Sequence, residues 1–184
     1  MKRTAFFVLM IIILLSLCGC SMGEEKAFLN FAETVTNAEN ISCNAHVRAE
    51  YSSISAEFDL KYLYENDESI IEIVKPQLIS GIKARVKDGE TRLEYEGAML
   101  DIGSLGDTWL SPMSSLPIMC RAIKDAHLDL AWDEDDMLVA RLIPEDDMTV
   151  TLWIDTETMA PVSAEITYKE KTAVFIDISD WEVG

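Results

Sequence analysis

The chain has 184 residues, and its 33 Asp and Glu residues outnumber its 15 Lys and Arg residues, which gives a formal charge of −18. An acidic chain of this kind is repelled by nucleic-acid phosphates and does not dock on anionic lipids through its side-chain charge. With 49% hydrophobic residues, the composition also excludes a disordered tail, a collagen-like chain and a polytopic membrane protein.

The first twenty residues have the pattern of a lipoprotein export signal. A basic start precedes an uncharged apolar run over residues 5–17, which is too short to span a bilayer as a helix. The run ends in Leu17-Cys18-Gly19-Cys20, which has the form of a lipobox. In such a signal the small Gly19 precedes the cleavage site and the thiol of Cys20 carries a diacylglyceryl group, whose two chains hold a protein on a membrane.

We therefore expect a signal peptide over residues 1–19, a lipidated tether over residues 20–23 and a single domain over residues 24–184. The protein would be exported and anchored to the cell membrane by Cys20. Loss of the signal removes two basic residues and no acidic one, so the mature chain carries a charge of about −20.

Apolar periodicity predicts the elements of this domain in chain order. Residues 24–38 have helical spacing, and from residue 41 apolar and polar side chains alternate, as in strands with one buried face. A loop with Trp109 follows the first strands, and residues 112–126 again have helical spacing, with a break expected at Pro117. The expected strands cover residues 41–51, 54–64, 69–75, 81–87, 91–96, a short segment ending at 102, 127–132, 137–143, 148–154, 162–168 and 172–178.

This pattern predicts an α+β fold, with about ten or eleven strands in meander order forming one large antiparallel sheet and two helical segments covering its apolar face. The inward positions of the strands and the apolar side of the second helix define either an apolar cavity or a filled core, and the sequence leaves both open. The residues of this predicted apolar site are Leu60, Tyr62, Val86, Leu93, Tyr95, Leu152 and Ile154 on the strands, with Met113, Leu116 and Met119 on the helix.

Catalytic motifs are missing from the mature sequence. It has two histidines, His46 and His127, and neither belongs to a zinc-protease motif; there is no nucleophile elbow, phosphate loop or Cys-x-x-Cys pair. The acidic runs 133–136 and 145–147 lack the spacing of a calcium loop and would lie about 20 Å apart, at opposite ends of one strand. The sequence therefore predicts a noncatalytic protein without a cofactor or a metal site.

Two further features have competing interpretations. Lys83, Arg85 and Lys87 form either a docking patch for an acidic partner or the solvent face of a strand that balances its own acidic neighbours, and we favour the second. Cys43 and Cys120 form either a disulfide, which an oxidising compartment allows, or two separate buried thiols, and we again favour the second.

Three segments together resemble the LolA-like lipoprotein-carrier superfamily: residues 76–82, the strand-turn-strand over residues 86–95, and Leu152-Trp-Ile-Asp-Thr-Glu-Thr-Met-Ala-Pro161. The resemblance implies an unclosed half-barrel whose helices cover an apolar cavity, and members that bind acyl chains or partner proteins. LolA itself is soluble, so the lipobox makes the chain most similar to the lipid-anchored clostridial branch with the germination lipoprotein GerS, which works with a cell-wall amidase.

The resemblance thus implies a lipoprotein that binds an envelope protein, such as a cortex amidase in spore germination. The alternative is a holder or carrier of lipid or lipoprotein acyl chains. An enzyme acting on envelope material is the third and least favoured interpretation.

Overall fold

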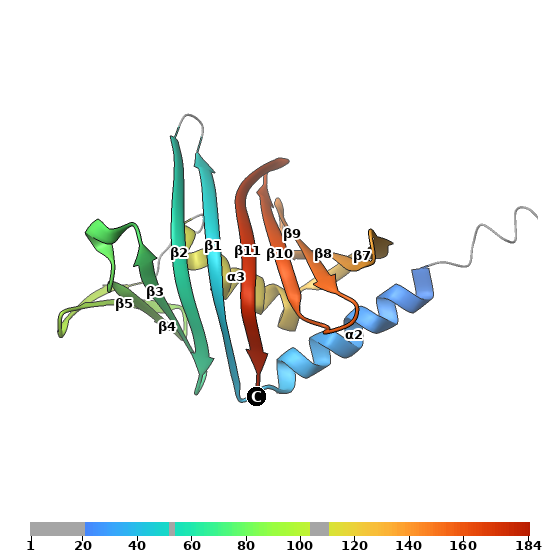
Figure 1. Cartoon of the computed structure of the whole chain (residues 1–184), viewed down its shortest axis with the longest axis horizontal. Coiled ribbons are helices and arrows are strands. Elements are labelled where there is room, and N and C mark those ends of the chain that lie inside the picture. The colour runs from blue at the N-terminus through green and yellow to red at the C-terminus, as the bar shows by residue number, and fades with distance from the viewer. Residues whose placement is uncertain (1–20, 52–53, 104–110) are drawn as a thin grey trace, which may run out of the picture.

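A computed structural model describes residues 21–51, 54–103 and 111–184. Within these residues it contains two α-helices and one antiparallel sheet of eleven strands, so the expected α+β class with an unclosed sheet is confirmed (Figure 1). The predicted signal peptide, the predicted lipidation site Cys20 and the predicted loop around Trp109 lie outside the described residues.

Both predicted helices are present. Helix α2 spans Ser21–Asn37 and begins three residues earlier than expected, so residues 21–23 of the predicted tether are helical. Helix α3 spans Pro112–Asp125 and is capped by Ser111, whose side-chain oxygen accepts a hydrogen bond from the amide of Met113 at 3.3 Å. The break expected at Pro117 was wrong, because Pro117 lies inside a continuous helix whose buried side offsets the lost backbone hydrogen bond.

The strands follow the expected alternation closely, and a short 3₁₀ turn, η1 (Gln77–Ile79), joins the third to the fourth. In chain order they are β1 (Asn40–Tyr51), β2 (Ile54–Glu65), β3 (Glu68–Lys75), β4 (Lys83–Lys87), β5 (Glu90–Tyr95), β6 (Ala98–Gly103), β7 (His127–Glu134), β8 (Met137–Glu145), β9 (Met148–Asp155), β10 (Pro161–Tyr168) and β11 (Lys171–Val183).

The order of strands in the sheet differs from a simple meander. The order is β6-β5-β4-β3-β2-β1-β11-β10-β9-β8-β7, so the first and last strands pair at the centre and β6 and β7 form the two edges. Ile41 pairs with Val183, and the carbonyl of Gly184 accepts hydrogen bonds from the amides of Glu39 and Asn40 at 2.8 and 3.1 Å. The expected meander order was wrong at this junction, because a period of two identifies a strand and its buried face but not its partner.

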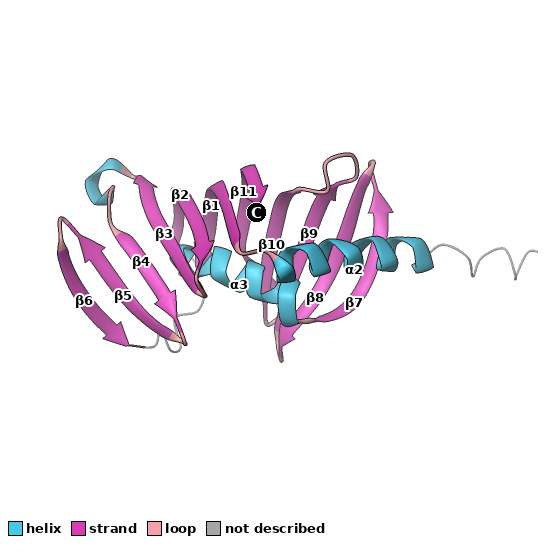
Figure 2. Cartoon of the chain, turned by 90° about the horizontal axis from the view of Figure 1, so that it is seen from below, coloured by secondary structure: helices cyan, strands magenta, loops and turns pink. Residues whose placement is uncertain are grey.

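Both helices lie across the same face of the curved sheet (Figure 2). Helix α3 contacts the central strands, and α2 packs on β7, β8 and α3. The inward side chains of β1 at positions 41, 43, 45, 47 and 49 are all buried, while those between them are more exposed. This alternation places one continuous apolar core between the sheet and the helices.

Acidic residues occupy many of the tight turns. Asn66-Asp67, Asp88-Gly89 and Asp135-Asp136 each have positive φ at both positions, as the two-residue hairpin turns of a twisted sheet require. Asp and Asn tolerate this left-handed conformation better than most residues. The acidic run at residues 133–136 therefore has a structural role in a turn.

The segment that carries the most specific part of the resemblance is the β9–β10 turn. The Asp155 carboxylate accepts hydrogen bonds from the amides of Glu157 and Thr158 at 3.1 and 2.7 Å and from the Thr158 hydroxyl at 2.8 Å. The bonds from Thr158 lower the pKa of Asp155. The motif thus fixes the turn that returns the chain to the sheet at Pro161.

Candidate functional site

Most of the predicted apolar site lies in the core between the sheet and α3. Six of its ten residues are at most 2% exposed and belong to one cluster: Leu60, Tyr62, Leu116, Met119, Leu152 and Ile154. In this structure these side chains pack against one another and against the rest of the core. Their use as a binding cavity stays a prediction.

The other four predicted residues lie at the periphery of this core. Val86, Leu93 and Met113 are partly buried and pack against the cluster. Tyr95 is 46% exposed, because β5 lies next to the β6 edge of the sheet. The structure therefore brings nine of the ten residues into or against one core and leaves Tyr95 on the surface.

A buried group of two thiols and a phenol lies inside the core, where β1, β2 and α3 meet. Burial raises the pKa of the Cys120 thiol to about 11. Burial, and then the proximity of Cys120, raise the pKa of the Cys43 thiol. Burial also raises the pKa of Tyr62 well above its ordinary value, and its hydroxyl lies 3.1 Å from that of Ser69.

All three groups are therefore neutral near pH 7, and neither thiol is an activated nucleophile. Both cysteines are free, as the favoured interpretation expected. The sequence placed Cys43 on the apolar phase of its strand and Cys120 on a helix, but it did not indicate that the two lie close together.

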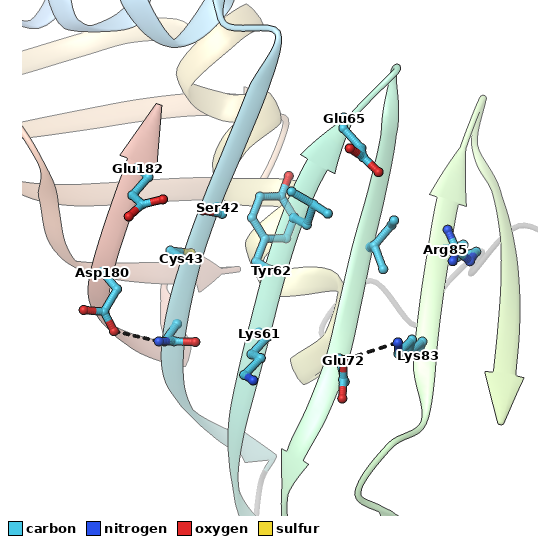
Figure 3. Close-up of a pocket in the computed structure, with 13 residues that line it drawn as sticks. Ser42, Cys43, Lys61, Tyr62, Glu65, Glu72, Lys83, Arg85, Asp180 and Glu182 are labelled. Carbon is cyan, nitrogen blue, oxygen red and sulfur yellow. Dashed lines mark hydrogen bonds and ion pairs between the residues drawn. The ribbon is translucent and has the colours of Figure 1, made fainter. Parts of the chain in front are cut away.

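A polar groove lies on the face of the sheet that points away from the helices (Figure 3). Its volume is about 570 Å³, and it runs across five strands, from β11 through β1, β2 and β3 to β4. Its charged side chains have both signs: Lys61, Lys83 and Arg85 against Glu65, Glu72, Asp180 and Glu182.

Much of this charge is compensated within the groove and its surroundings. Lys83 lies 3.4 Å from Glu72, and Asn44 donates a hydrogen bond to Asp180 at 2.6 Å. Arg85 forms ion pairs with Glu68 at 2.9 Å and Glu94 at 3.0 Å, and the bond to Glu94 contributes most to raising the Arg85 pKa. These contacts support the solvent-face interpretation of the basic residues on β4.

A smaller groove of about 390 Å³ lies between α2, the β9–β10 turn and the end of β11. Phe31, Met159, Ala160, Trp181 and Val183 give it an apolar lining, and Asn30, Thr34 and Thr158 add polar groups. Sequence reasoning missed this groove, because it combines residues that are about 130 to 150 positions apart along the chain.

His46 belongs to a group of charged side chains on the outer face of the sheet, and the two acidic runs lie in separate turns. The Nδ1 atom of His46 lies 2.8 Å from the Asp59 carboxylate, which also pairs with Lys75 at 2.6 Å. The acidic runs 133–136 and 145–147 lie at opposite ends of β8, as predicted. Among residues 21–51, 54–103 and 111–184, no cluster of three or more His, Cys, Asp or Glu side chains is suited to hold a metal ion.

Comparison with known proteins identifies the class of fold. No family model and no curated protein sequence matches the chain. Among solved structures, it is similar to an uncharacterized conserved protein from Thermus thermophilus, with 9% identity over 87% of each chain and a TM-score of 0.51. It is also similar to a LolA superfamily protein from Nitrosomonas europaea, with 15% identity over 86% of this chain and 93% of the other and a TM-score of 0.49.

A further similar structure is the complex of the CwlD amidase with the GerS lipoprotein from Clostridioides difficile. The match has 15% identity, covers 86% of this chain and 94% of the other, and has a TM-score of 0.45. At 9% identity and a TM-score of 0.51, the match to the Thermus thermophilus protein shows a similar fold and nothing more specific.

Neither described helix is long and apolar enough to cross a membrane.

Proposed function

We propose that this chain is a noncatalytic, lipid-anchored lipoprotein that binds a partner protein of the cell envelope. The membrane anchor would be Cys20, at the end of the lipobox. The partner would be an envelope enzyme such as a cortex amidase, in a GerS-like role in spore germination. The sequence resemblance over residues 76–82, 86–95 and 152–161, together with the lipobox, supports this choice of partner class.

The distribution of apolar side chains carries this proposal. The core under α3 is packed with side chains that are almost fully buried, while large apolar side chains lie exposed at one end of the sheet. Four of the eight large apolar side chains that lie exposed in the described residues are at this end: Leu78 on η1, Tyr95 on β5, and Met99 and Leu100 on β6. The other four, Leu29, Leu130, Ile143 and Val183, are distributed over α2, β7, β8 and β11 and are less exposed than Leu78, Met99 and Leu100. A concentration of apolar residues on a solvent-exposed surface is typical of protein interaction sites.

The proposal is tested by chemical crosslinking of the full-length, affinity-tagged lipoprotein in its native membrane, followed by purification in detergent. We expect one envelope protein to co-purify in a fixed stoichiometric ratio. Lipid extraction and mass spectrometry of the same sample provide the comparison. Acyl lipid bound at one per chain, with no protein partner, would contradict the proposal.

The anchor is tested separately with Cys20→Ser. We expect the variant to lose metabolic labelling by radioactive palmitate, because a serine hydroxyl does not replace the thiol that would carry the diacylglyceryl group. A variant that stays in the membrane fraction and keeps the label would contradict lipidation at Cys20.

The holder or carrier of acyl chains is the second candidate function, and the groove between α2 and β11 favours it. Its volume of about 390 Å³ and its apolar lining fall within the range of small-molecule sites. Saturable uptake of a fluorescent fatty acid that is lost with Trp181→Asp, but kept with Trp132→Asp, would support this function.

A further inference from the structure

The two edges of the sheet differ in how they are protected from pairing with another strand. Edge strand β7 carries the charged residues Asp129, Asp133 and Glu134, and its register with β8 is broken between Leu128 and Leu130. Helix α2 packs against it. Inward or edge charges, irregular pairing and a covering helix are the means by which natural sheets prevent edge-to-edge association.

Among residues 21–51, 54–103 and 111–184, edge strand β6 has little of this protection. Its sequence, Ala-Met-Leu-Asp-Ile-Gly, has one charged residue. Met99 is 58% exposed and Leu100 is 63% exposed, and as successive residues of a strand they point to opposite faces of the sheet. Tyr95, on the neighbouring strand and 46% exposed, extends the apolar surface on the Leu100 side.

The backbone of β6 is also oriented for pairing. Glu96 and Gly97 have φ values of +51° and +83°, which define a two-residue hairpin turn, so Tyr95 and Ala98 form its closing hydrogen-bonded pair. Bonded and non-bonded pairs alternate along an antiparallel ladder. The N–H and C=O groups of Met99 therefore point away from β5, toward the outer side of the sheet.

The position and charge of this part of the sheet favour an outside partner. In Figure 2, β4, β5 and β6 extend beyond the end of α3, away from both helices. Residues 68–103 carry five basic and seven acidic side chains, whereas residues 111–184 carry five basic and sixteen acidic ones. Electrostatic repulsion of another acidic envelope protein is therefore weakest at the β6 end.

We propose that β6 is the docking edge for the partner protein, which adds an extended segment of its own chain to the sheet beside Met99. This inference rests on the proposed partner-binding function and specifies how that function is achieved. The added strand would form main-chain hydrogen bonds with β6, and its alternate side chains would contact Met99 on one face and Leu100 with Tyr95 on the other. A segment with apolar side chains and little negative charge fits this edge best. A second copy of this chain fits it less well, because each mature copy carries a charge of about −20.

Three variants of the full-length lipoprotein test the proposal in the crosslinking and co-purification experiment. Met99→Pro removes the outward N–H but no hydrogen bond between β5 and β6, and Met99→Lys adds a charge to the same edge. Leu130→Lys is the matched control, since Leu130 is an exposed apolar residue, at 43%, on the opposite edge. We expect at least a tenfold loss of the co-purified partner with both Met99 variants and less than a twofold change with the Leu130 variant.

Circular dichroism and the melting temperature establish that each variant is folded, and Met99→Lys keeps the test valid if Met99→Pro does not fold. A photo-crosslinking amino acid at position 100 then identifies the contacted segment by mass spectrometry. Crosslinks to an extended segment of the co-purified partner would support the proposal, and crosslinks to a second copy or to lipid alone would overturn it.

The outcomes separate this inference from the function on which it rests. If the parent protein co-purifies with a partner and the Met99 variants retain it fully, the docking edge is wrong while the partner-binding function stands. If the parent protein co-purifies with no partner, both are wrong.

Discussion

At the scale of single residues, burial under α3 determines the protonation state of three ionisable side chains. Tyr62, Cys43 and Cys120 bring three ionisable groups into the core, and burial keeps each of them neutral. A neutral thiol is a poor nucleophile and a poor metal ligand. Tyr62, Cys43 and Cys120 therefore contribute to the packing of the core.

This leads to a prediction for thiol labelling. A purified chain of residues 21–184 should expose no reactive thiol to a disulfide reagent at pH 8, because the raised pKa of Cys120, about 11, and of Cys43 leaves both thiols protonated and buried. In denaturant without reductant, two thiols should react in the parent and one in Cys43→Ala. No reaction in denaturant would instead indicate a disulfide between Cys43 and Cys120.

A pair of leucine substitutions measures how completely the space under α3 is filled. Leu116→Ala should lower the free energy of unfolding by about 2–5 kcal/mol, because the side chain is fully buried in a packed core. Leu93→Ala removes the same atoms from a partly buried site and should lower it by less. Unfolding in denaturant at pH 7 measures the free energy of unfolding of both variants. If both variants lower it by the same small amount, the space under α3 is not filled, and the acyl-chain holder is favoured.

At the scale of elements, the tight turns between strands carry unfavourable residues as well as favourable ones. Lys169 and Glu170 join β10 to β11 with φ values of +48° and +63°. Neither residue type favours this left-handed conformation, whereas Asn-Gly does. The left-handed conformation of Lys169 and Glu170 therefore lowers the stability of the folded state.

Replacing Lys169-Glu170 with Asn-Gly should raise the free energy of unfolding by about 1 kcal/mol. The reciprocal change provides the control: Asp88-Gly89, with φ values of +51° and +78°, replaced by Lys-Glu should lower it. Thermal melting of both variants measures the effect. A lower melting temperature for the Asn-Gly variant would mean that the contact between Lys169 and the Tyr168 ring matters more than turn strain.

The elements also show how far the sequence determines the structure. Alternation located β1 to within one residue of Ile41 and correctly assigned Leu60, Tyr62 and Leu152 to the inward face. It also assigned Tyr95 to that face, but the phase of a strand does not reveal whether anything covers the side chain. The pairing of β1 with β11 and the grooves depend on contacts between distant segments, which no local pattern records.

At the scale of the whole molecule, the sheet is held together at its centre by the two most distant strands. The β1–β11 pair joins β2–β6 to β7–β10, and Gly184 ends it with backbone hydrogen bonds to Glu39 and Asn40. Trp181 packs against the core from the same end of β11. The stability of both halves therefore depends on the last residues of the chain.

Removing residues 181–184 should lower the free energy of unfolding by on the order of 3 kcal/mol, through lost backbone hydrogen bonds and lost burial of Trp181. Trp181→Ala, which keeps the backbone, should account for only part of this loss. Unfolding in urea measures both variants. An unchanged midpoint for the truncated chain would show that the β1–β11 pair is stable without its terminal residues.

The central position of β11 has a consequence for how the protein first folds. Among the strands of the described sheet, β1 and β11 are the one neighbouring pair that is not consecutive in the sequence. These two strands meet across a connecting segment of about 120 residues, a non-local step that is slow compared with forming the hairpins on either side. The interval before this pair forms is therefore when the chain is most exposed to aggregation and to proteolysis, and when assistance from a folding factor would have the largest effect on yield.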